Sequence, residues 1–521
     1  MENSSPEKTS STITEDIQIL HRLGYAQELA RCLNGFSNFA ISLSIICILA
    51  GGLTSFHIGY GSVGGAAIGI GWPLACLFSL AVALTMGQIA SAFPTAGGLY
   101  HWAAILGGRG WGWLTAWFNL AGLVTVLAAI NVGTVQFMFG AFWPEVPCTP
   151  MIQLSLVLAI TLTQTVFNHL GMRVTRILTD FSGYWILIIS LALTACLLFS
   201  CDTWDVSRLF TFSNMSGQPA DAPVWPKSES QLWLFALGLL LPAYTITGFD
   251  ASAHASEETI GAARNVPRGI VRSVLVSGLF GWVMLIAVVL AMKDPAQAIE
   301  QGDKIFFGTL LKALPSALAT WLCVGITIAQ YLCGLATVTS ASRMTFAFAR
   351  DGGLPFSSAI RTVSPRFRTP AIAIWLVATV AVGFTAYTPI YSTITAVCVI
   401  FLYISYVLPT VLGMLALGNR WKTLGPWHLG SWFKPLALVS ILWCVGLIVI
   451  GMQPPNDKAA IVVPGVLLFL GAYWFFAARH HFPGPPVGVL TQQQRDAITA
   501  AEVAVHEPTH VPVEARGTTS E

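Results

Sequence analysis

The chain has 521 residues, of which 55% are apolar, 11% aromatic and 10% charged, and its mean hydropathy is +0.70. This composition excludes an ordinary soluble domain, in which about a quarter of the residues are charged, and it excludes a disordered or fibrous chain. The 26 Lys and Arg residues nearly balance the 24 Asp and Glu residues, so no nucleic acid partner is indicated. The sequence therefore predicts an all-α polytopic membrane protein with the lipid bilayer as its surroundings.

Stretches poor in charged residues predict twelve transmembrane helices, because about 20 apolar residues cross the roughly 30 Å hydrocarbon core. Residues 1–34 are charged and hold no apolar run typical of a cleavable signal peptide, so we expect the first span to direct insertion. The predicted spans are 35–55, 67–90, 111–139, 152–170, 182–201, 232–257, 271–292, 316–343, 370–387, 391–416, 435–452 and 460–478. Residues 481–521 form a tail.

The distribution of basic residues predicts the orientation. With twelve spans, 20 of the 26 Lys and Arg residues fall in the N-terminal segment, the even-numbered loops, the tail, or, for Arg272 and Arg343, at the span ends that border these loops. Positive charge concentrates on the cytoplasmic side of membrane proteins. The sequence therefore predicts a multi-pass protein of the cell membrane with both termini in the cytoplasm.

The ten cysteines show no metal-binding spacing, and buried free thiols are expected. A bridge between Cys148 and Cys201 stays open, because both fall near the predicted outer surface. His506 and His510 have a helical spacing, but a solvated tail is favoured over a metal site. No metal and no organic cofactor are expected.

Two predicted spans are interrupted. The first contains paired serines and glycines between Ser42 and Gly52, and the sixth contains Pro242, Gly248 and Asp250. Such interruptions are expected where backbone lines a cavity or packs into protein, and close helix packing is the alternative for the glycines. Spans one and six are equivalent in a five-plus-five inverted repeat, which is typical of transporters. We therefore expect a ten-helix transport core at 35–416 and two additional spans at 417–480.

Three segments carry a resemblance to a known family: residues 88–102 (QIASAFPTAGGLYHW), 248–259 (GFDASAHASEET) and 342–357 (SRMTFAFARDGGLPFS). They resemble the signature regions of the amino acid-polyamine-organocation superfamily, and within it the amino acid/choline branch with GABA permease-like proteins. The resemblance implies a secondary transporter that moves amino acids or related amines by alternating access. Among the substrates of this superfamily, we expect zwitterionic amino acids and GABA in preference to choline and polyamines.

The resemblance also implies a substrate site between the unwound middles of spans one and six. Backbone amides between Ile48 and Gly52 would receive a carboxylate, Tyr244 would be an aromatic gate, and carbonyls near Tyr244 and Thr247 would take an ammonium group. Half-helix ends favour such charges. The full set of candidate residues is Ser44, Ile48, Leu49, Ala50, Gly51, Gly52, Tyr244, Thr247, Gly248, Phe249 and Asp250.

Two departures from the family pattern bear on this interpretation. The first-span segment reads Leu-Ala-Gly-Gly rather than the Gly-x-Gly of many relatives, which weakens the inferred carboxylate geometry. The fifth span has no Lys, whereas some proton-coupled relatives place one there. Coupling to H⁺ or to Na⁺ stays open.

Polar groups near the predicted site have more than one interpretation. Asp250 would attract a substrate cation, titrate during coupling, or cap the second half of the broken helix. Glu257, Glu258 and Arg343 would form a gate or lie at a solvated helix end, which is favoured because exposed ion pairs contribute little. The resemblance implies that spans one and eight adjoin. In that case a Na⁺ ion could be bound by the hydroxyls of Ser44, Thr337, Thr339 and Ser340.

Two other classes of function compete with a transporter. A membrane enzyme needs a convergent acid, base or nucleophile set, and the sequence offers Asp250 with His254 one helical turn on. A sensor that binds without transporting usually carries a soluble signalling domain, and no loop has room for one. We therefore expect a transporter of a small amino acid or amine, not an enzyme.

Overall fold

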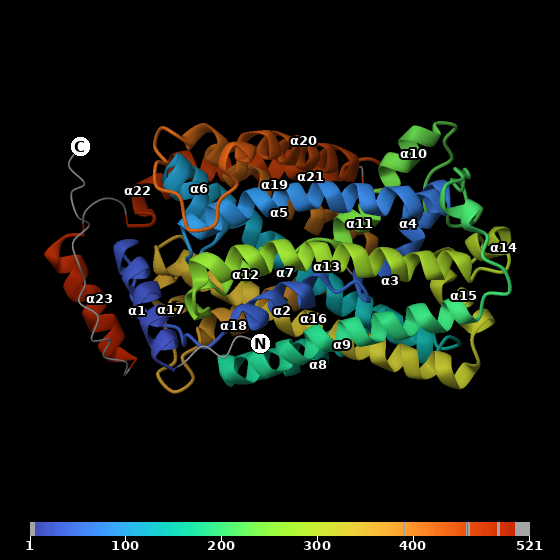
Figure 1. Ribbon diagram of the computed structural model, residues 1–521, viewed down its shortest axis with the longest axis horizontal. Coiled ribbons are helices and arrows are strands. Elements are labelled where there is room, and N and C mark those ends of the chain that lie inside the picture. Colours follow the sequence, from blue (N-terminus) through green and yellow to red (C-terminus); the bar gives the residue numbers. More distant parts are fainter. Residues whose placement is uncertain (1–5, 389–390, 455, 457–458, 487–489, 506–521) are drawn as a thin grey trace.

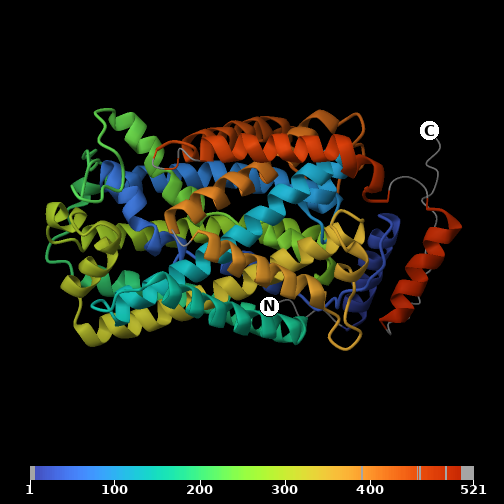
Figure 2. The same ribbon diagram turned by 180° about the vertical axis from the view of Figure 1, so that it is seen from behind.

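The computed structural model describes residues 6–388, 391–454, 456, 459–486 and 490–505. Most of its helices run along one long axis and form a single bundle (Figure 1). Helices α1 (Pro6–Arg22) and α23 (Gln492–Ala504) lie across one end of this bundle, and Figure 2 shows the same arrangement from behind. Within the described ranges the chain is helical and forms no strand beyond two isolated bridges. The predicted all-α class is confirmed.

Ten helical segments are long and apolar enough to cross a membrane in the described part of the chain, and two further apolar helices are shorter. The long segments contain α2 (Gly35–Ile46) with α3 (Gly51–Thr54), η1 (Ala67–Gly71) with α5 (Trp72–Ala92), α7 (Arg109–Phe142), α8 (Pro150–His169), α9 (Met172–Phe199), α13 (Ala262–Leu290), α16 (Ser316–Arg350), α19 (Tyr391–Ala416), η5 (Gly430–Trp432) with α20 (Phe433–Gly451), and α21 (Ala459–Tyr473) with η6 (Trp474–Ala478) and α22 (Arg479–His481). The shorter ones are α10 (Gln231–Gly238) with α11 (Leu240–Thr245), and α18 (Ala371–Tyr387). Each of the twelve predicted spans coincides with one of these segments.

The connections hold shorter helices: α4 (Phe56–Val63), α6 (Leu99–Gly107), η2 (Val206–Leu209), α12 (Ala251–His254), η3 (Ser256–Glu258), α14 (Pro295–Ile299), η4 (Gly302–Lys304), α15 (Ile305–Ala313) and α17 (Ser357–Ile360). The largest boundary errors are two starts: the seventh span begins at Ala262, not at 271, and the fifth span begins at Met172, not at 182. Its first turns carry charges that looked incompatible with a span. Arg176 donates to the carbonyl of Cys32 at 2.8 Å and Asp180 accepts from Ser37 at 3.0 Å, so protein contacts compensate these charges.

The first and sixth spans run antiparallel. Helix α12 contacts α2, α11 contacts α3 and α4, and α10 contacts α4, so the sixth span meets the first in reverse order. Other contacts follow the same symmetry: α5 packs on α13, α7 on α16 and α8 on α18, which pairs the second, third and fourth spans with the seventh, eighth and ninth. These pairings are the ones expected of an inverted repeat. Helix α20 packs on the outside of these paired spans, where it contacts α5 and α19.

The two ends of the described chain meet at one end of the bundle (Figure 1). The carboxylate of Glu502 on α23 accepts from the amide N–H of Gln27 at 2.9 Å and lies 2.7 Å from Nε2 of His21 on α1. We call this the terminal end. Cys148 and Cys201 are both free thiols near the opposite end, so the bridge left open by the sequence does not form. His506 and His510 lie outside the described residues.

Candidate substrate site

The first span is interrupted between α2 and α3. Helix α2 ends at Ile46, Cys47 has φ +23°, and the chain becomes helical again at Gly51. The amides of Gly51 and Gly52 donate to the carbonyls of Cys47 and Ile48, each at 3.1 Å. Among the described residues, the amides of Ile48 and Leu49 donate to no partner. Of the predicted segment from Ile48 to Gly52, the two glycine amides are therefore bonded within the chain, and the free donors are those of Ile48 and Leu49.

The sixth span is interrupted between α11 and α12. Helix α11 ends at Thr245, and Gly248 has φ +83°, a conformation that a residue with a Cβ adopts only with strain. Within the described ranges, the carbonyls of Thr245, Ile246 and Thr247 accept no hydrogen bond. The Tyr244 carbonyl already accepts from the Thr247 hydroxyl at 2.7 Å. Three unpaired carbonyls therefore mark this break.

The two interruptions lie against each other. The hydroxyl of Ser42 donates to the carbonyl of Phe249 and accepts from the amide of Ser252, both at 2.9 Å. A Cβ added to Gly51 would lie 2.9 Å from Cα of Thr245. The backbones therefore touch at Gly51, and close packing explains this glycine. Unpaired amides of one span and unpaired carbonyls of the other occur in the same small region.

Gly51 and Gly52 provide a matched test of this packing. We expect Gly51→Ala to lower stability by about 1–3 kcal/mol, because the added methyl group meets backbone that cannot move away. Gly52→Ala should be tolerated, since its Cβ would meet the side chain of Met284 at an ordinary 3.7 Å. Thermal unfolding of the purified variants measures both effects. Equal unfolding temperatures would contradict the contact between the spans.

Asp250 is fully buried beside the second interruption. Its carboxylate accepts from Nδ2 of Asn119 at 3.1 Å and from the hydroxyl of Tyr406 at 2.8 Å, and it lies 3.3 Å from Nε2 of His254. It makes no capping hydrogen bond to α12, because Asp250 is itself in the helical conformation. The capping interpretation is therefore wrong. Tyr406 and Asn119 were not among the predicted site residues, since they come from distant spans.

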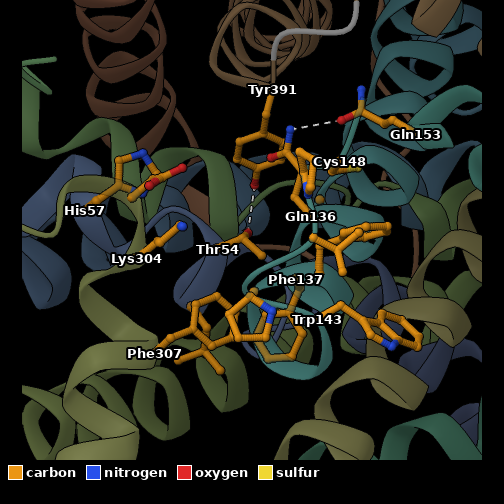
Figure 3. A pocket seen from close by; sticks show the side chains of 18 of the residues that line it. Thr54, His57, Gln136, Phe137, Trp143, Cys148, Gln153, Lys304, Phe307 and Tyr391 are labelled. Carbon is orange, nitrogen blue, oxygen red and sulfur yellow. Dashed lines mark hydrogen bonds between the residues drawn. The ribbon is translucent and has the colours of Figure 1, made fainter. Parts of the chain in front are cut away.

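Two cavities of about 840 and 680 Å³ open at the end of the bundle opposite the terminal end. Because His57, Asp303 and Lys304 line both, we describe them together as the vestibule. Figure 3 shows the residues that line the first cavity, with the hydroxyl of Tyr391 pointing toward Thr54. Their hydroxyls are 2.8 Å apart.

The inner limit of the vestibule is an aromatic pair. The rings of Tyr244 and Tyr391 are perpendicular, with centroids 6.3 Å apart. Tyr244 lines one cavity and Tyr391 the other. Thr54, which bonds to Tyr391, follows the first interruption by four residues. Leu53, Thr54 and Tyr244 are the lining residues nearest in sequence to the breaks, so the vestibule ends one turn or less from each break, with Tyr244 at its inner end.

The terminal end is closed by two buried ion pairs, which we call the gate cluster. Arg343 donates to both carboxylate oxygens of Glu258 at 3.0 Å, and Arg350 donates to Glu257 at 3.0 and 2.8 Å. Both glutamates are 0% exposed, so the expectation of a solvated helix end is wrong. The reason is the N-terminal segment, which packs over them. Its amides at Cys32 and Leu33 bond to the Glu258 carbonyl.

A second buried cluster surrounds Asp351, directly after α16. Its Oδ2 atom accepts from Tyr25 at 2.8 Å and Tyr100 at 2.7 Å, and lies 3.0 Å from Nε2 of His101. Burial raises the pKa of this carboxyl. The contacts with His101 and the nearby Arg350 outweigh burial and hold the pKa of Asp351 below its ordinary value. This cluster ties the N-terminal segment to α6 and α16.

Of the four hydroxyls considered as sodium ligands, two already donate hydrogen bonds within the protein. Thr339 donates to Asn168 on α8 at 2.7 Å, and Thr337 donates to the Cys333 carbonyl at 2.9 Å. The hydroxyls of Ser44 and Ser340 are buried without a hydrogen-bond partner among the described residues. The described ranges contain no group of three or more His, Cys, Asp or Glu side chains that would hold a metal. A sodium site stays a prediction.

Comparison with known proteins agrees with this architecture. The model of the amino acid permease family matches residues 33–476. The chain is 32% identical to the amino-acid permease BAT1 of Arabidopsis thaliana, over 91% of this chain and 96% of that protein. It is 28% identical to amino-acid permease 2 of Neurospora crassa, over 97% and 94% of the two chains. The chain therefore belongs to the amino acid permease family, and it is a membrane transporter, not an enzyme.

Proposed function

We propose that this permease carries zwitterionic amino acids by alternating access, and that its structure corresponds to the state with the vestibule open and the gate cluster closed. The observation that carries the proposal is the meeting of two kinds of unpaired backbone group. Amides at Ile48 and Leu49 attract a carboxylate, and carbonyls from Thr245 to Thr247 attract an ammonium group. Alternating access then needs the gate cluster to open and the vestibule to close.

The two kinds of group favour some substrate classes over others. An α-amino acid or GABA carries both a carboxylate and an ammonium group. Choline and polyamines carry no carboxylate, so they would leave the amides of Ile48 and Leu49 desolvated and unpaired. A lost hydrogen bond to a charged group weakens binding by about 1.5–3 kcal/mol. Amino acids and GABA are therefore placed ahead of choline and polyamines.

We also propose that the terminal end faces the cytoplasm and that the vestibule faces the outside of the cell. The excess of Lys and Arg at the terminal end supports this orientation. Cys148 lines the vestibule and offers a test. A membrane-impermeant maleimide added to intact cells should label the protein, and Cys148→Ser should reduce the labelling. Labelling of Cys148 only after permeabilisation would contradict this orientation.

Uptake into proteoliposomes tests the transport proposal. Labelled alanine, glutamate, arginine, GABA, choline and putrescine are each supplied under an imposed proton or sodium gradient. We expect alanine or GABA to accumulate, and choline and putrescine not to do so. Binding of an amino acid without uptake or exchange would favour the sensor, while preferred uptake of choline or putrescine would contradict the proposed carboxylate site.

Tyr244 should contribute to substrate affinity. Tyr244→Ala removes the ring that separates the vestibule from the breaks, and we expect KM to rise about tenfold, which corresponds to about 1.4 kcal/mol. Tyr387 is a matched control, because its side chain is 86% exposed at the end of α18. Tyr387→Ala should leave KM unchanged. An unchanged KM for Tyr244→Ala would remove Tyr244 from the site.

A further inference from the structure

Asp250 and His254 form a titratable pair deep in the bundle. Both side chains are 0% exposed, and Oδ2 of Asp250 lies 3.3 Å from Nε2 of His254. The pair sits at the junction of the broken sixth span and α12, beside the unpaired carbonyls. An ionisable group at such a depth is costly, so it calls for a functional explanation.

The hydrogen bonds around the pair determine how many protons it holds. Nδ1 of His254 lies 3.0 Å from the carbonyl oxygen of Ala96, which can only accept, so Nδ1 carries a hydrogen. A neutral His254 would then present a lone pair at Nε2 to Asp250. Two acceptors repel each other, so this contact needs one further proton, on Nε2 or on the carboxyl. The pair is therefore protonated in this conformation.

The other partners of Asp250 cannot replace this proton. Tyr406 donates to Oδ1 and Asn119 donates to Oδ2, so neither removes the conflict with His254. Without the proton, the pair would hold one uncompensated negative charge in a dry site. An unpaired buried charge is strongly unfavourable. Loss of the proton should therefore destabilise this arrangement.

The pair joins the substrate region to the gate cluster through hydrogen bonds. On one side, the amide of Gly248 donates to the hydroxyl of Tyr406 at 3.1 Å, and this hydroxyl donates to Asp250. On the other side, His254 bonds to the Ala96 carbonyl, and the Ala96 amide donates to Glu257 at 3.0 Å. The chain of contacts therefore runs from the unwound sixth span to the ion pair that closes the terminal end.

The charged groups around α12 have partners of their own. On α16 and η3, Arg343 pairs with Glu258 and Arg350 with Glu257. His101 on α6 is bonded to Thr95 and Asp351. Helix α2 has no titratable side chain. The basic residues at the start of α13, which are exposed, are Arg264, Arg268 and Arg272.

We propose that the Asp250–His254 pair is the proton-binding site of this permease and that it couples proton movement to substrate transport. This inference rests on the proposed function. One proton would bind together with substrate while the vestibule is open. Opening of the gate cluster would separate His254 from Ala96 and release the proton on the other side. The pair thus supplies a titratable site that the Lys-free fifth span does not.

Proton movement can be measured directly in proteoliposomes that enclose a pH-sensitive dye. Addition of a transported amino acid should acidify the interior for the wild-type protein. Asp250→Asn and His254→Gln should abolish this acidification and accumulation against a gradient, and His254→Gln, which changes no candidate substrate-binding residue, should retain exchange of labelled for unlabelled substrate. Asp180→Asn is the matched control, because Asp180 is a carboxylate in a span, bonded to Ser37, and has no histidine partner among the described residues. It should acidify the vesicles like the wild type.

The outcomes separate the two proposals. No uptake or exchange of any amino acid by the wild type would overturn the proposed function. Exchange without acidification by the wild type, or acidification by Asp250→Asn, would leave the function intact and overturn the proton site. If either variant does not fold, the affinity of the wild-type protein for the amino acid, measured at several pH values, tests the proton site instead. Linkage predicts that its affinity falls up to tenfold per pH unit above the pKa of the pair, and a pH-independent affinity would overturn the site.

Discussion

Arg343→Met is expected to abolish transport and to lower the free energy of unfolding by about 3–5 kcal/mol. Arg343 and Glu258 are both 0% exposed and share two hydrogen bonds of 3.0 Å. Removal of the guanidinium would leave the Glu258 carboxylate buried without its cation. The carboxylate must then take up a proton or draw water into the closed end, and either change opens the gate cluster.

A control variant distinguishes the loss of the buried ion pair from the loss of a positive charge elsewhere in the protein. Lys422 is an exposed basic residue of the loop before α20, so Lys422→Met should leave unfolding temperature and uptake unchanged. The double variant Glu258→Gln with Arg343→Met removes the unpaired charge and should regain much of the stability but not the transport. Thermal unfolding and alanine uptake measure these variants. A stable, active Arg343→Met protein would contradict the role of this pair in closing the terminal end.

Gly248→Ala should reduce transport at least about tenfold while leaving the protein able to fold. Gly248 has φ +83°, which costs a residue with a Cβ about 1–2 kcal/mol. The added methyl group would also lie 2.3 Å from Cγ2 of Ile45, and such overpacking costs about 1–3 kcal/mol. Both costs fall on the interruption that presents the free carbonyls. The substrate region should therefore change shape first.

A second substitution distinguishes the two costs. Ile45→Ala combined with Gly248→Ala removes Cγ2 of residue 45, and with it the closest overlap, but not the backbone strain, so uptake should recover only in part. Gly446 on α20 is the control, because an added Cβ meets nothing within 4 Å there. Gly446→Ala should leave uptake unchanged. Wild-type uptake by Gly248→Ala would show that the glycine is not needed for the break.

The sequence predicts the spans well because membrane-length apolar stretches leave few alternatives. The break in the sixth span is also predictable, since Pro242, Gly248 and Asp250 mark it. The break in the first span is predicted from its serines and glycines, but its exact position is not, because the chain unwinds at Cys47 to Ala50, where no glycine or proline stands. Contacts from a distant span fix it instead: the Cys47 thiol lies 3.7 Å from the Ala329 carbonyl.

The buried charges were harder to predict for a different reason. Glu257 and Glu258 stand at the end of the predicted sixth span, and a position at the end of a span usually faces water. Their burial depends on Cys32 and Leu33, which lie more than two hundred residues earlier in the chain. His254 is one turn from Asp250, so their proximity is predictable. Its bond to Ala96 is not, because it depends on how the loop after α5 folds back.

The central claim is that an amino acid binds where the two breaks meet. A cryo-EM map of the protein in lipid nanodiscs with saturating alanine, or with whichever amino acid is transported, tests it most directly. We predict density for the carboxylate at the amides of Ile48 and Leu49 and for the ammonium group at the carbonyls of Thr245 to Thr247, beneath Tyr244. Density confined to the vestibule, or an empty break at concentrations that saturate uptake, would contradict the account.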